Sequence, residues 1–286
     1  MALNPARLMA HDIPEVRQRI TARDCVLYAL SIGLSQDPLD DRQLDYVDAD
    51  RALKVVPSMA VVLGHPGFWL GDPKFGVDAV RLVHGEQAIT LHGPLPVDGE
   101  ITAKTHVTGL VDKGAGKGAL LFTEKHVRDA ATGALIASTR ATVFLRGDGG
   151  FGGASSTTPP ANPMPASPPD ITVTLATRPE QALLYRLNGD DNPLHSDPAV
   201  ALAAGFPRPI LHGLCTAGVV THALLQALCD YDAARLKGWQ LRFSAPVYPG
   251  ETILTDIWRD GSFRARVAER DVVVINNGMA RVGAST

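Results

Sequence analysis

The sequence predicts an α+β protein built from two similar halves, each of which ends in an antiparallel β-meander. Three observations lead to this prediction. A stretch rich in Gly, Ser and Pro divides the 286 residues near their middle, three short motifs recur in the same order on both sides of it, and a long amphipathic helical pattern occurs only in the second half. The shared order favours an internal duplication, so we expect two antiparallel sheets in one molecule.

The boundaries of the two halves follow from the dividing stretch. Residues 146–170 show neither the helical nor the strand period of apolar residues and are predicted to form a linker. We therefore expect an N-terminal domain over residues 1–150, a linker over residues 151–168 and a C-terminal domain over residues 169–286. The recurring motifs are YALSIG from Tyr28, HG at His84 and PLPVDGEI from Pro94 in the first half, and YRLNGD from Tyr185, HG at His212 and PVYPGETI from Pro246 in the second.

Short β-like runs follow the last motif of each half. In the first half, apolar residues alternate over 101–107, and the runs 119–129 and 134–145 follow the turn segments DKGAGKG and ATG. In the second half the runs are 253–258, 263–268 and 272–282. Each half is therefore predicted to contain an antiparallel meander.

The two halves differ between the HG motif and the meander. In the second half 33 positions separate Gly213 from Pro246, and apolar residues recur at helical spacing from Leu214 to Leu228, which predicts a long helix packed on the sheet. In the first half only nine positions separate Gly85 from Pro94, too few for such a helix. We expect the corresponding face of the first sheet to be less filled.

Composition limits the class of protein and partner. Apolar residues make up 45% of the chain, which suffices for a hydrophobic core, and 27 basic against 30 acidic residues leave a net charge of −3. No run of like charge indicates nucleic acid or an anionic membrane, so a small-molecule partner is favoured. The sequence has no secretory segment, membrane-spanning run or peroxisomal C-terminal signal, and we expect a cytoplasmic protein. The three cysteines, Cys25, Cys215 and Cys229, lack the spacing of a disulfide framework or zinc site and are expected to be buried.

The segment YRLNGDDNPLHSDP, residues 185–198, concentrates polar chemistry in one loop. A fully extended chain would separate Asp190 from His195 by roughly 16 Å, so the two can act together only if the chain bends between them. Gly189 permits an unusual φ and Pro193 keeps Asn192 out of the helical region, which predicts such a bend. A short helix should follow, with its N-cap at Asp197, Pro198 in its first turn and its stop at Gly205.

The stretch YRLNGDDNPLHSDPAVALAAGFPRPILHGLC, together with DKGAGKG and FLRGDGGFGG, resembles the (R)-specific 2-enoyl-CoA hydratases, also called hydratase 2, of the MaoC-like dehydratase family. Asn188 stands where this family commonly has Ser. The resemblance implies a double hot-dog fold, in which each half wraps an antiparallel sheet around a helix and the first half has lost that helix to make room for an acyl chain. It also implies reversible hydration of trans-2-enoyl-CoA to (3R)-3-hydroxyacyl-CoA, in fatty-acid metabolism and β-oxidation, with no cofactor and with acyl-CoA as the small-molecule partner.

The resemblance assigns a role to each catalytic residue. Asp190 and His195 share the proton transfers on one water, Asn192 orients that water, and the amide of Gly213 binds the thioester oxygen. The chemistry agrees, because hydration needs a water activated toward Cβ, a proton delivered to Cα and a donor for the oxygen that becomes negative. Gly213 lies where the long helix should begin, so its N–H is free of helical hydrogen bonds and has the positive end of the helix behind it.

The same residues also allow other interpretations. Taken alone, Asp190 and Asn192 are ordinary turn residues, and His212 is either a substrate-orienting or a packed histidine. An iron site of two histidines and one carboxylate can be drawn from Asp190, Asp191, His195, Asp197 and His212, but no metal-binding motif supports it, so no metal is expected. The matching segment of the first half lacks the Asn and His, which predicts one active site per chain and a structural role for Asp37.

Substrate-binding candidates are less specific. Phe68 and Trp69 are predicted to line the acyl pocket, although aromatic residues are as often plain core, and His212 and Arg186 are predicted to contact the substrate. Arg186, Arg208, Lys113 and Lys117 are candidates for the CoA phosphates. The competing functions are a hot-dog acyl-CoA thioesterase and a non-catalytic acyl-CoA-binding protein, and acyl-carrier-protein substrates and a homodimer are also left open.

Overall fold

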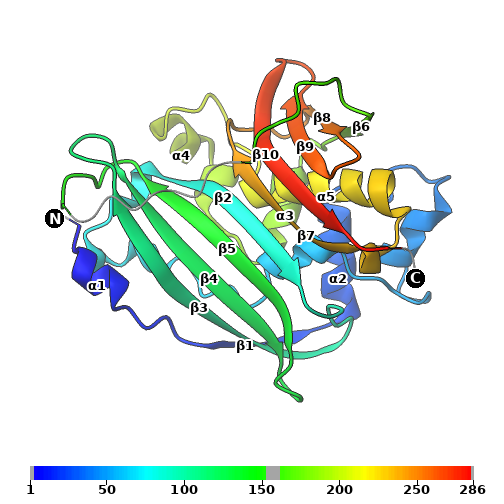
Figure 1. Cartoon of the computed structure of the whole chain (residues 1–286), viewed down its shortest axis with the longest axis horizontal. Coiled ribbons are helices and arrows are strands. Elements are labelled where there is room, and N and C mark those ends of the chain that lie inside the picture. Colours follow the sequence, from blue (N-terminus) through cyan, green and yellow to red (C-terminus); the bar gives the residue numbers. More distant parts are fainter. Residues whose placement is uncertain (1–2, 153–161, 285–286) are drawn as a thin grey trace.

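Ten strands form one continuous antiparallel sheet in the order β1-β3-β4-β5-β2-β7-β10-β9-β8-β6 (Figure 1). The structure is a computed structural model that describes residues 3–152 and 162–284. The two expected antiparallel sheets are joined into one, because β2 of the first half pairs with β7 of the second, for example Ala88 with Gln240. This pairing satisfies the backbone groups of both strands, which would otherwise form two open sheet edges.

The strand order is the same in the two halves, as the recurring motifs predicted. The first half runs β1-β3-β4-β5-β2 and the second β6-β8-β9-β10-β7, so each strand has a counterpart five strands later. All six predicted meander strands are present. The strands are β1 Val16–Ile20, β2 Leu82–Leu91, β3 Gly99–Asp112, β4 Ala119–Asp129, β5 Leu135–Leu145, β6 Ile171–Ala176, β7 Leu236–Phe243, β8 Thr252–Ile257, β9 Ser262–Val267 and β10 Val272–Val282.

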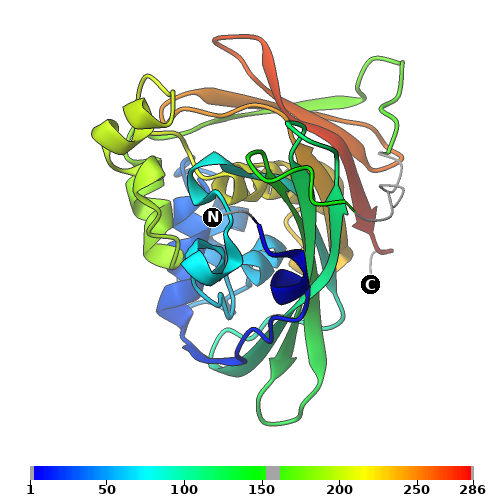
Figure 2. The same ribbon diagram turned by 90° about the vertical axis from the view of Figure 1, so that its left-hand side faces the viewer.

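The long predicted helix is α5, Gly213–Cys229, and most of its residues are buried. Figure 2 shows it on the concave side of the sheet, where the other helices also lie. It packs against β6, β8 and β10 of its own half and against η2 of the first half. The remaining helical elements are α1 Pro5–Met9, α2 Ala22–Ser31, α3 Gln181–Tyr185, α4 Pro198–Ala203, η1 Asp41–Tyr46, η2 Pro57–Val61, η3 Trp69–Gly71, η4 Pro73–Phe75, η5 Ala79–Arg81, η6 Arg186–Asn188, η7 Pro193–His195 and η8 Ala233–Arg235.

One of the three recurring motifs was matched wrongly. His84 and Gly85 lie inside β2, whose counterpart is β7, whereas His212 and Gly213 lie at the start of α5. The first half still lacks the long helix, as expected from its shorter spacing. Between α2 and β2 its described residues form only the short 3-10 helices η1 to η5. A two-residue motif carries too little information to fix an equivalence on its own.

The buried side chains form two clusters. The larger spans both halves and includes Ile89 and Val127 of the first, Ile253 and Phe263 of the second, and most of α5. The smaller lies at the far end of the first half and contains Leu8, Leu70, Phe75, Ala119, Leu121 and Leu145. Because one core joins the halves, each half depends on the other for burial.

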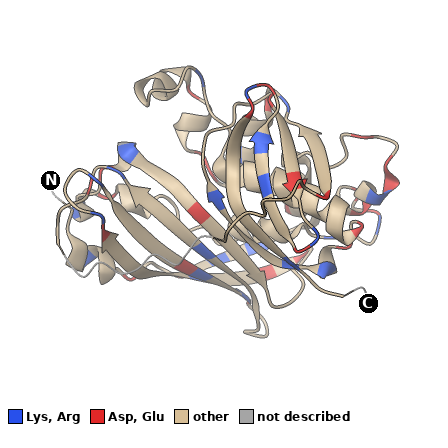
Figure 3. Cartoon of the chain, turned by 45° about the horizontal axis from the view of Figure 1, so that its top comes forward, with Lys and Arg blue, Asp and Glu red and all other residues tan. Residues whose placement is uncertain are grey.

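The structure also bears on the cysteines, the linker, the distribution of charge and membrane-spanning helices. Cys25, Cys215 and Cys229 are buried and unpaired, as predicted. Of the predicted linker, residues 153–161 lie outside the described residues, and the adjoining described residues form neither helix nor strand. Basic and acidic residues are interspersed over the molecule (Figure 3), as the balanced composition suggests. No helix in the described part of the chain has the length and apolar character needed to span a membrane.

Candidate active site

The loop after α3 bends as the sequence predicted. Gly189 adopts φ 105°, a left-handed conformation that a side chain would strain, and Asn192 has an extended ψ of 120° before η7 begins at Pro193. Asp197 then caps α4, its Oδ1 accepting the Ala199 amide at 2.8 Å. The loop therefore turns back on itself between Asp190 and His195.

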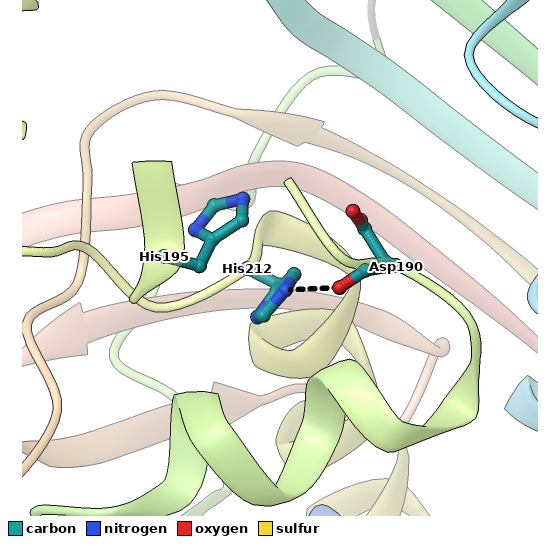
Figure 4. A group of neighbouring side chains, drawn as sticks. All are labelled: Asp190, His195 and His212. Atoms are coloured by element: carbon teal, nitrogen blue, oxygen red, sulfur yellow. Dashed lines mark hydrogen bonds between the residues drawn. The ribbon is translucent and has the colours of Figure 1, made fainter. Parts of the chain in front are cut away.

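This bend brings three predicted residues together. One side-chain ligand atom of each of Asp190, His195 and His212 lies within 4.8 Å of the others. Figure 4 shows the carboxylate of Asp190 and the ring of His195 facing a common space, with the ring of His212 beneath them. His195 is 9% exposed, His212 is 1% exposed and Asp190 is half-buried. The group is thus largely shielded from solvent, with the carboxylate at its open side.

The backbone fixes the tautomer of His195. Its Nδ1 lies 2.8 Å from the carbonyl oxygen of Ile210, which can only accept a hydrogen bond, so the ring proton is on Nδ1. Burial lowers the pKa of His195 below its usual value, although the bond to Ile210 and the charge of Asp190 oppose this effect. The imidazole is therefore neutral at pH 7, and its Nε2 lone pair is free to accept a proton.

His212 lies between the loop and the helix. It is the N-cap residue of α5, its Nε2 lies 3.2 Å from the backbone oxygen of Asp190, and its ring stacks on His195 with centroids 3.7 Å apart and planes at 29°. Its Nδ1 is buried and has no hydrogen-bond partner among the described residues. Burial and the proximity of His195 lower the pKa of His212 to about 4.

One ligand atom of each residue lies close enough to the others for a shared metal ion, but the stacked rings are unfavourable for binding one. A metal bound by imidazole lies in the ring plane about 2 Å from the nitrogen, and two nearly parallel rings direct their lone pairs side by side instead of at one point. Asp191 is exposed, and Asp197 is engaged as the cap of α4. The group of Asp190, His195 and His212 is better suited to hydrogen bonding and proton transfer.

Gly213 is the first residue of α5 and directly follows His212. Its amide donates no hydrogen bond among the described residues and has the positive end of a 17-residue helix behind it. A Cβ at this position would lie 3.3 Å from the ring of Phe243. The absence of a side chain therefore lets the amide stay close to this ring.

Asn192 and the predicted substrate-binding residues other than His212 lie outside the group. Asn192 is exposed and caps η7, its Oδ1 accepting the Leu194 amide at 3.0 Å. Arg186 donates to the backbone oxygen of Asp191 at 3.1 Å, and its buried Nε has no hydrogen-bond partner among the described residues. Arg208 lies over the ring of Tyr248 at 5.0 Å.

The aromatic and lysine candidates have different surroundings. Trp69 packs edge-on against Phe75 at 5.6 Å in the smaller core cluster, so the alternative of a plain core role describes it well. Phe68 is 61% exposed. Lys113 and Lys117 lie in the exposed turn between β3 and β4 and form no ion pair within the described residues.

His84 is a neighbour of the site that was not predicted from the sequence. Its ring meets Phe243 edge-on at 5.0 Å, and Phe243 in turn covers Gly213. Burial lowers the pKa of His84, and the charge of Asp190 acts in the opposite direction. The only signal in the sequence was the HG pair, which we had interpreted as a repeat. A residue of the first half, His84, therefore packs against Phe243 next to Gly213.

Comparisons with known proteins cover both halves of the chain. The MFE-2 hydratase 2 N-terminal domain family matches residues 19–147, and the MaoC like domain family matches residues 160–281. The chain is 39% identical to "Enoyl-CoA hydratase 2, peroxisomal" of Arabidopsis thaliana, over 95% of this chain and 93% of that protein. It is 41% identical to "3-hydroxyacyl-thioester dehydratase Y" of Mycobacterium tuberculosis, over 95% of this chain and 94% of that protein.

Solved structures show the same architecture. A MaoC-like dehydratase from Phytophthora capsici matches with a TM-score of 0.86 and 32% identity, covering 99% of both chains. A Mycobacterium tuberculosis protein described as having a double hotdog fold matches with a TM-score of 0.55 and 15% identity, over 99% of this chain and 96% of that chain. The repeated strand order around α5 is therefore a double hot-dog fold.

Proposed function

Because this chain belongs to the hydratase 2 family of MaoC-like enzymes, we propose that it reversibly hydrates trans-2-enoyl-CoA to (3R)-3-hydroxyacyl-CoA. The chain is an enzyme of the hydro-lyase class, as its relatives are. The observation that carries the proposal is the meeting of Asp190, His195 and the start of α5 at one place in the fold. The stereochemistry follows from the resemblance of the loop sequence to the (R)-specific hydratases.

The proposed first step is activation of a water between Asp190 and His195. The free Nε2 of His195 accepts a proton from the water as its oxygen attacks Cβ of the enoyl group, and the Asp190 carboxylate holds the water by accepting its other hydrogen. Asn192 is proposed to orient the same water through its side-chain amide group, since its Oδ1 already accepts a hydrogen bond from Leu194. The proton taken up by the pair is then delivered to Cα.

The amide of Gly213 is proposed to bind the thioester oxygen. Attack at Cβ moves negative charge onto this oxygen, and a donor fixed at a helix start stabilises it without reorganisation. By analogy with other oxyanion holes, one such donor lowers the barrier by about 3 to 4 kcal/mol. The thioester would lie between Gly213 and the water, with CoA leading out past Arg186.

Three further proposals concern cofactors, cellular location and oligomeric state. We propose that the reaction needs no cofactor or metal, so dialysis against a chelator should leave the rate unchanged. We also propose a cytoplasmic enzyme, although relatives include peroxisomal proteins. A homodimer is the expected assembly and can be checked by light scattering.

One assay tests the proposed function. Purified protein is incubated with crotonyl-CoA and with longer enoyl-CoAs while the enoyl absorbance and free thiol are followed together. We expect absorbance to fall without thiol release, and we expect the product to be a substrate for a (3R)-specific but not a (3S)-specific dehydrogenase. Thiol release would instead indicate a thioesterase, and no change with any chain length would indicate a binding protein. Parallel reactions with enoyl groups on acyl-carrier protein would show which carrier is preferred.

A further inference from the structure

We propose that His212 is a positioning residue for this reaction, which holds the backbone at Asp190 and supports the ring of His195 without contacting the substrate. The inference rests on the proposed function and deepens it. It also replaces the expectation that His212 binds substrate with a different role for the same side chain.

Two contacts carry the inference (Figure 4). The Nε2–H of His212 donates to the backbone oxygen of Asp190 at 3.2 Å, and the face of its ring lies against His195 at 3.7 Å. Asp190 and His195 lie on a loop and a short 3-10 helix, which on their own would leave both side chains mobile. The position of His212 is fixed by the start of α5, so its two contacts restrict the movement of Asp190 and His195.

Aromatic packing behind His212 extends this support into both halves. The ring of Tyr185 lies 5.0 Å from that of His212, and Tyr185 meets Tyr28 of the first half at 6.1 Å. Tyr28 is anchored by a hydrogen bond of 2.9 Å from its hydroxyl to Ser58. Pairwise ring contacts therefore connect His195, through His212 and Tyr185, to Tyr28 in the core. The position of the proposed base therefore depends on packing across the whole molecule.

The surroundings of His212 also keep it uncharged. Its Nε2–H is used by Asp190, and a second proton on the buried Nδ1 would find no acceptor among the described residues. The charged and titratable groups that act on it are Asp190, His195 and Arg186. The carboxylate of Asp190 favours the charged form of His212, whereas burial, His195 and Arg186 disfavour it. The net effect is a lowered pKa of His212. His195 can therefore take up a proton beside a neutral ring.

Two variants separate the roles of the two contacts. His212→Phe keeps a flat ring against His195 but removes the donor to Asp190, whereas His212→Gln places an amide N–H where Nε2 was and removes the ring. We expect kcat of His212→Phe to fall about 100-fold with KM changed little, because a displaced loop costs about this much. The hydrogen bond kept by His212→Gln should make its kcat about tenfold higher than that of His212→Phe.

A second measurement does not depend on activity. The imidazole of His195 is titrated by NMR in the wild type and in both variants. In His212→Phe the loop should open to water, so the pKa of His195 should rise toward its ordinary value, and in His212→Gln it should rise less. A histidine that only fills space would not shift the titration of its neighbour in this order.

The chain offers a matched control on the same helix. His222 is 2% exposed, and its Nε2 lies 3.0 Å from the hydroxyl of Tyr231, away from the active-site group. His222→Phe and His222→Gln therefore make the same chemical changes at another buried histidine. They should lower the thermal midpoint but leave kcat and the titration of His195 unchanged.

Two results would overturn the inference. One is a kcat for His212→Phe within about twofold of the wild type, far from the expected loss. The other is equal loss in both His212 variants with an unchanged pKa of His195, which would mean a general packing role. If the wild type itself hydrates no enoyl thioester, the proposed function fails, while the titrations of His195 still decide whether His212 positions it.

Discussion

Asp190 and His195 owe their expected chemistry to different surroundings. His195 is buried, and its single proton is fixed by the Ile210 carbonyl, whereas Asp190 is half-buried and reaches the open side of the group. Replacing Asp190 by Asn or His195 by Gln removes one proton-transfer group and keeps the volume nearly constant. We expect each change to lower kcat by a factor of about 100 to 10,000.

Circular dichroism and thermal unfolding are the controls for these two variants. Both should remain folded, because Asn and Gln are close in size to the side chains that they replace and can still form hydrogen bonds. Wild-type turnover in both folded variants would show that the catalytic residues lie elsewhere.

Lys125 is a buried residue outside the active site. The effect of its burial on the free energy of unfolding should be measurable. It is 6% exposed on β4, and its ammonium donates to the backbone oxygens of Val61 and Leu63 at 2.9 and 2.5 Å. Burial lowers the pKa of Lys125 from 10.5 to about 7. Between these two pH values the unfolded chain binds more protons than the folded one, so the free energy of unfolding should rise with pH, by at most about 1.4 kcal/mol per unit.

The Lys125→Met variant should lose this rise, which urea unfolding at pH 7, 8 and 9 would reveal. The matched control is Lys117→Met, since Lys117 is exposed and should not affect the pH dependence. Parallel curves for wild type and Lys125→Met over this range would mean that the amine keeps its ordinary pKa.

Among the secondary-structure elements, α5 connects the fold to the chemistry. Its first residue, Gly213, supplies the proposed oxyanion donor, and a Cβ there would lie 3.3 Å from the ring of Phe243. Gly213→Ala should therefore push the start of the helix away by a few tenths of an ångström. We expect kcat to fall about 10-fold to 100-fold, a little less than the loss of a whole oxyanion donor.

The double variant Gly213→Ala with Phe243→Leu tests this explanation. Shortening the ring relieves the contact, so part of the lost rate should return. The helix itself should not suffer, because Ala favours helix more than Gly does. No recovery in the double variant would mean that the contact with Phe243 is not what displaces the amide.

The sequence predicted elements better than their spatial neighbours. The bend at Gly189, the cap at Asp197 and the start of α5 all depend on local backbone preferences, and each was predicted from the residues themselves. The pairing of β2 with β7 and the approach of His84 to Phe243 depend on contacts between residues far apart in the chain. Local patterns contain no information on such contacts, and the repeated HG pair was therefore misinterpreted.

Considered as a whole, the molecule is two repeats fused along one pair of strands. The β2–β7 pairing and the larger core cluster both cross this boundary, and the active site lies beside it, with His84 on β2 and Phe243 at the end of β7. We therefore expect the two halves to unfold in one transition. Calorimetry should show equal calorimetric and van't Hoff enthalpies.

Gly238 lies at the boundary between β2 and β7, where there is no room for a side chain. It lies on β7 with φ 154°, and a Cβ there would be 2.3 Å from the backbone oxygen of Ile89 on β2. The overlap involves backbone on both sides and cannot be relieved by a rotamer change, so Gly238→Ala should force the two strands apart. Overpacking of this kind costs about 1 to 3 kcal/mol or more, which for a chain of this size lowers the thermal midpoint by roughly 2 to 5 °C or more.

Gly93→Ala is the matched control for Gly238→Ala, because a Cβ at Gly93, just beyond the end of β2, would meet only Ile136 at an ordinary 3.9 Å. This variant should unfold like the wild type. Gly238→Ala should also lose activity before it unfolds, because separating β2 from β7 moves His84 and Phe243 away from Gly213. Two separate unfolding transitions, or full activity in Gly238→Ala close to its midpoint, would show that the halves and the site do not depend on this boundary.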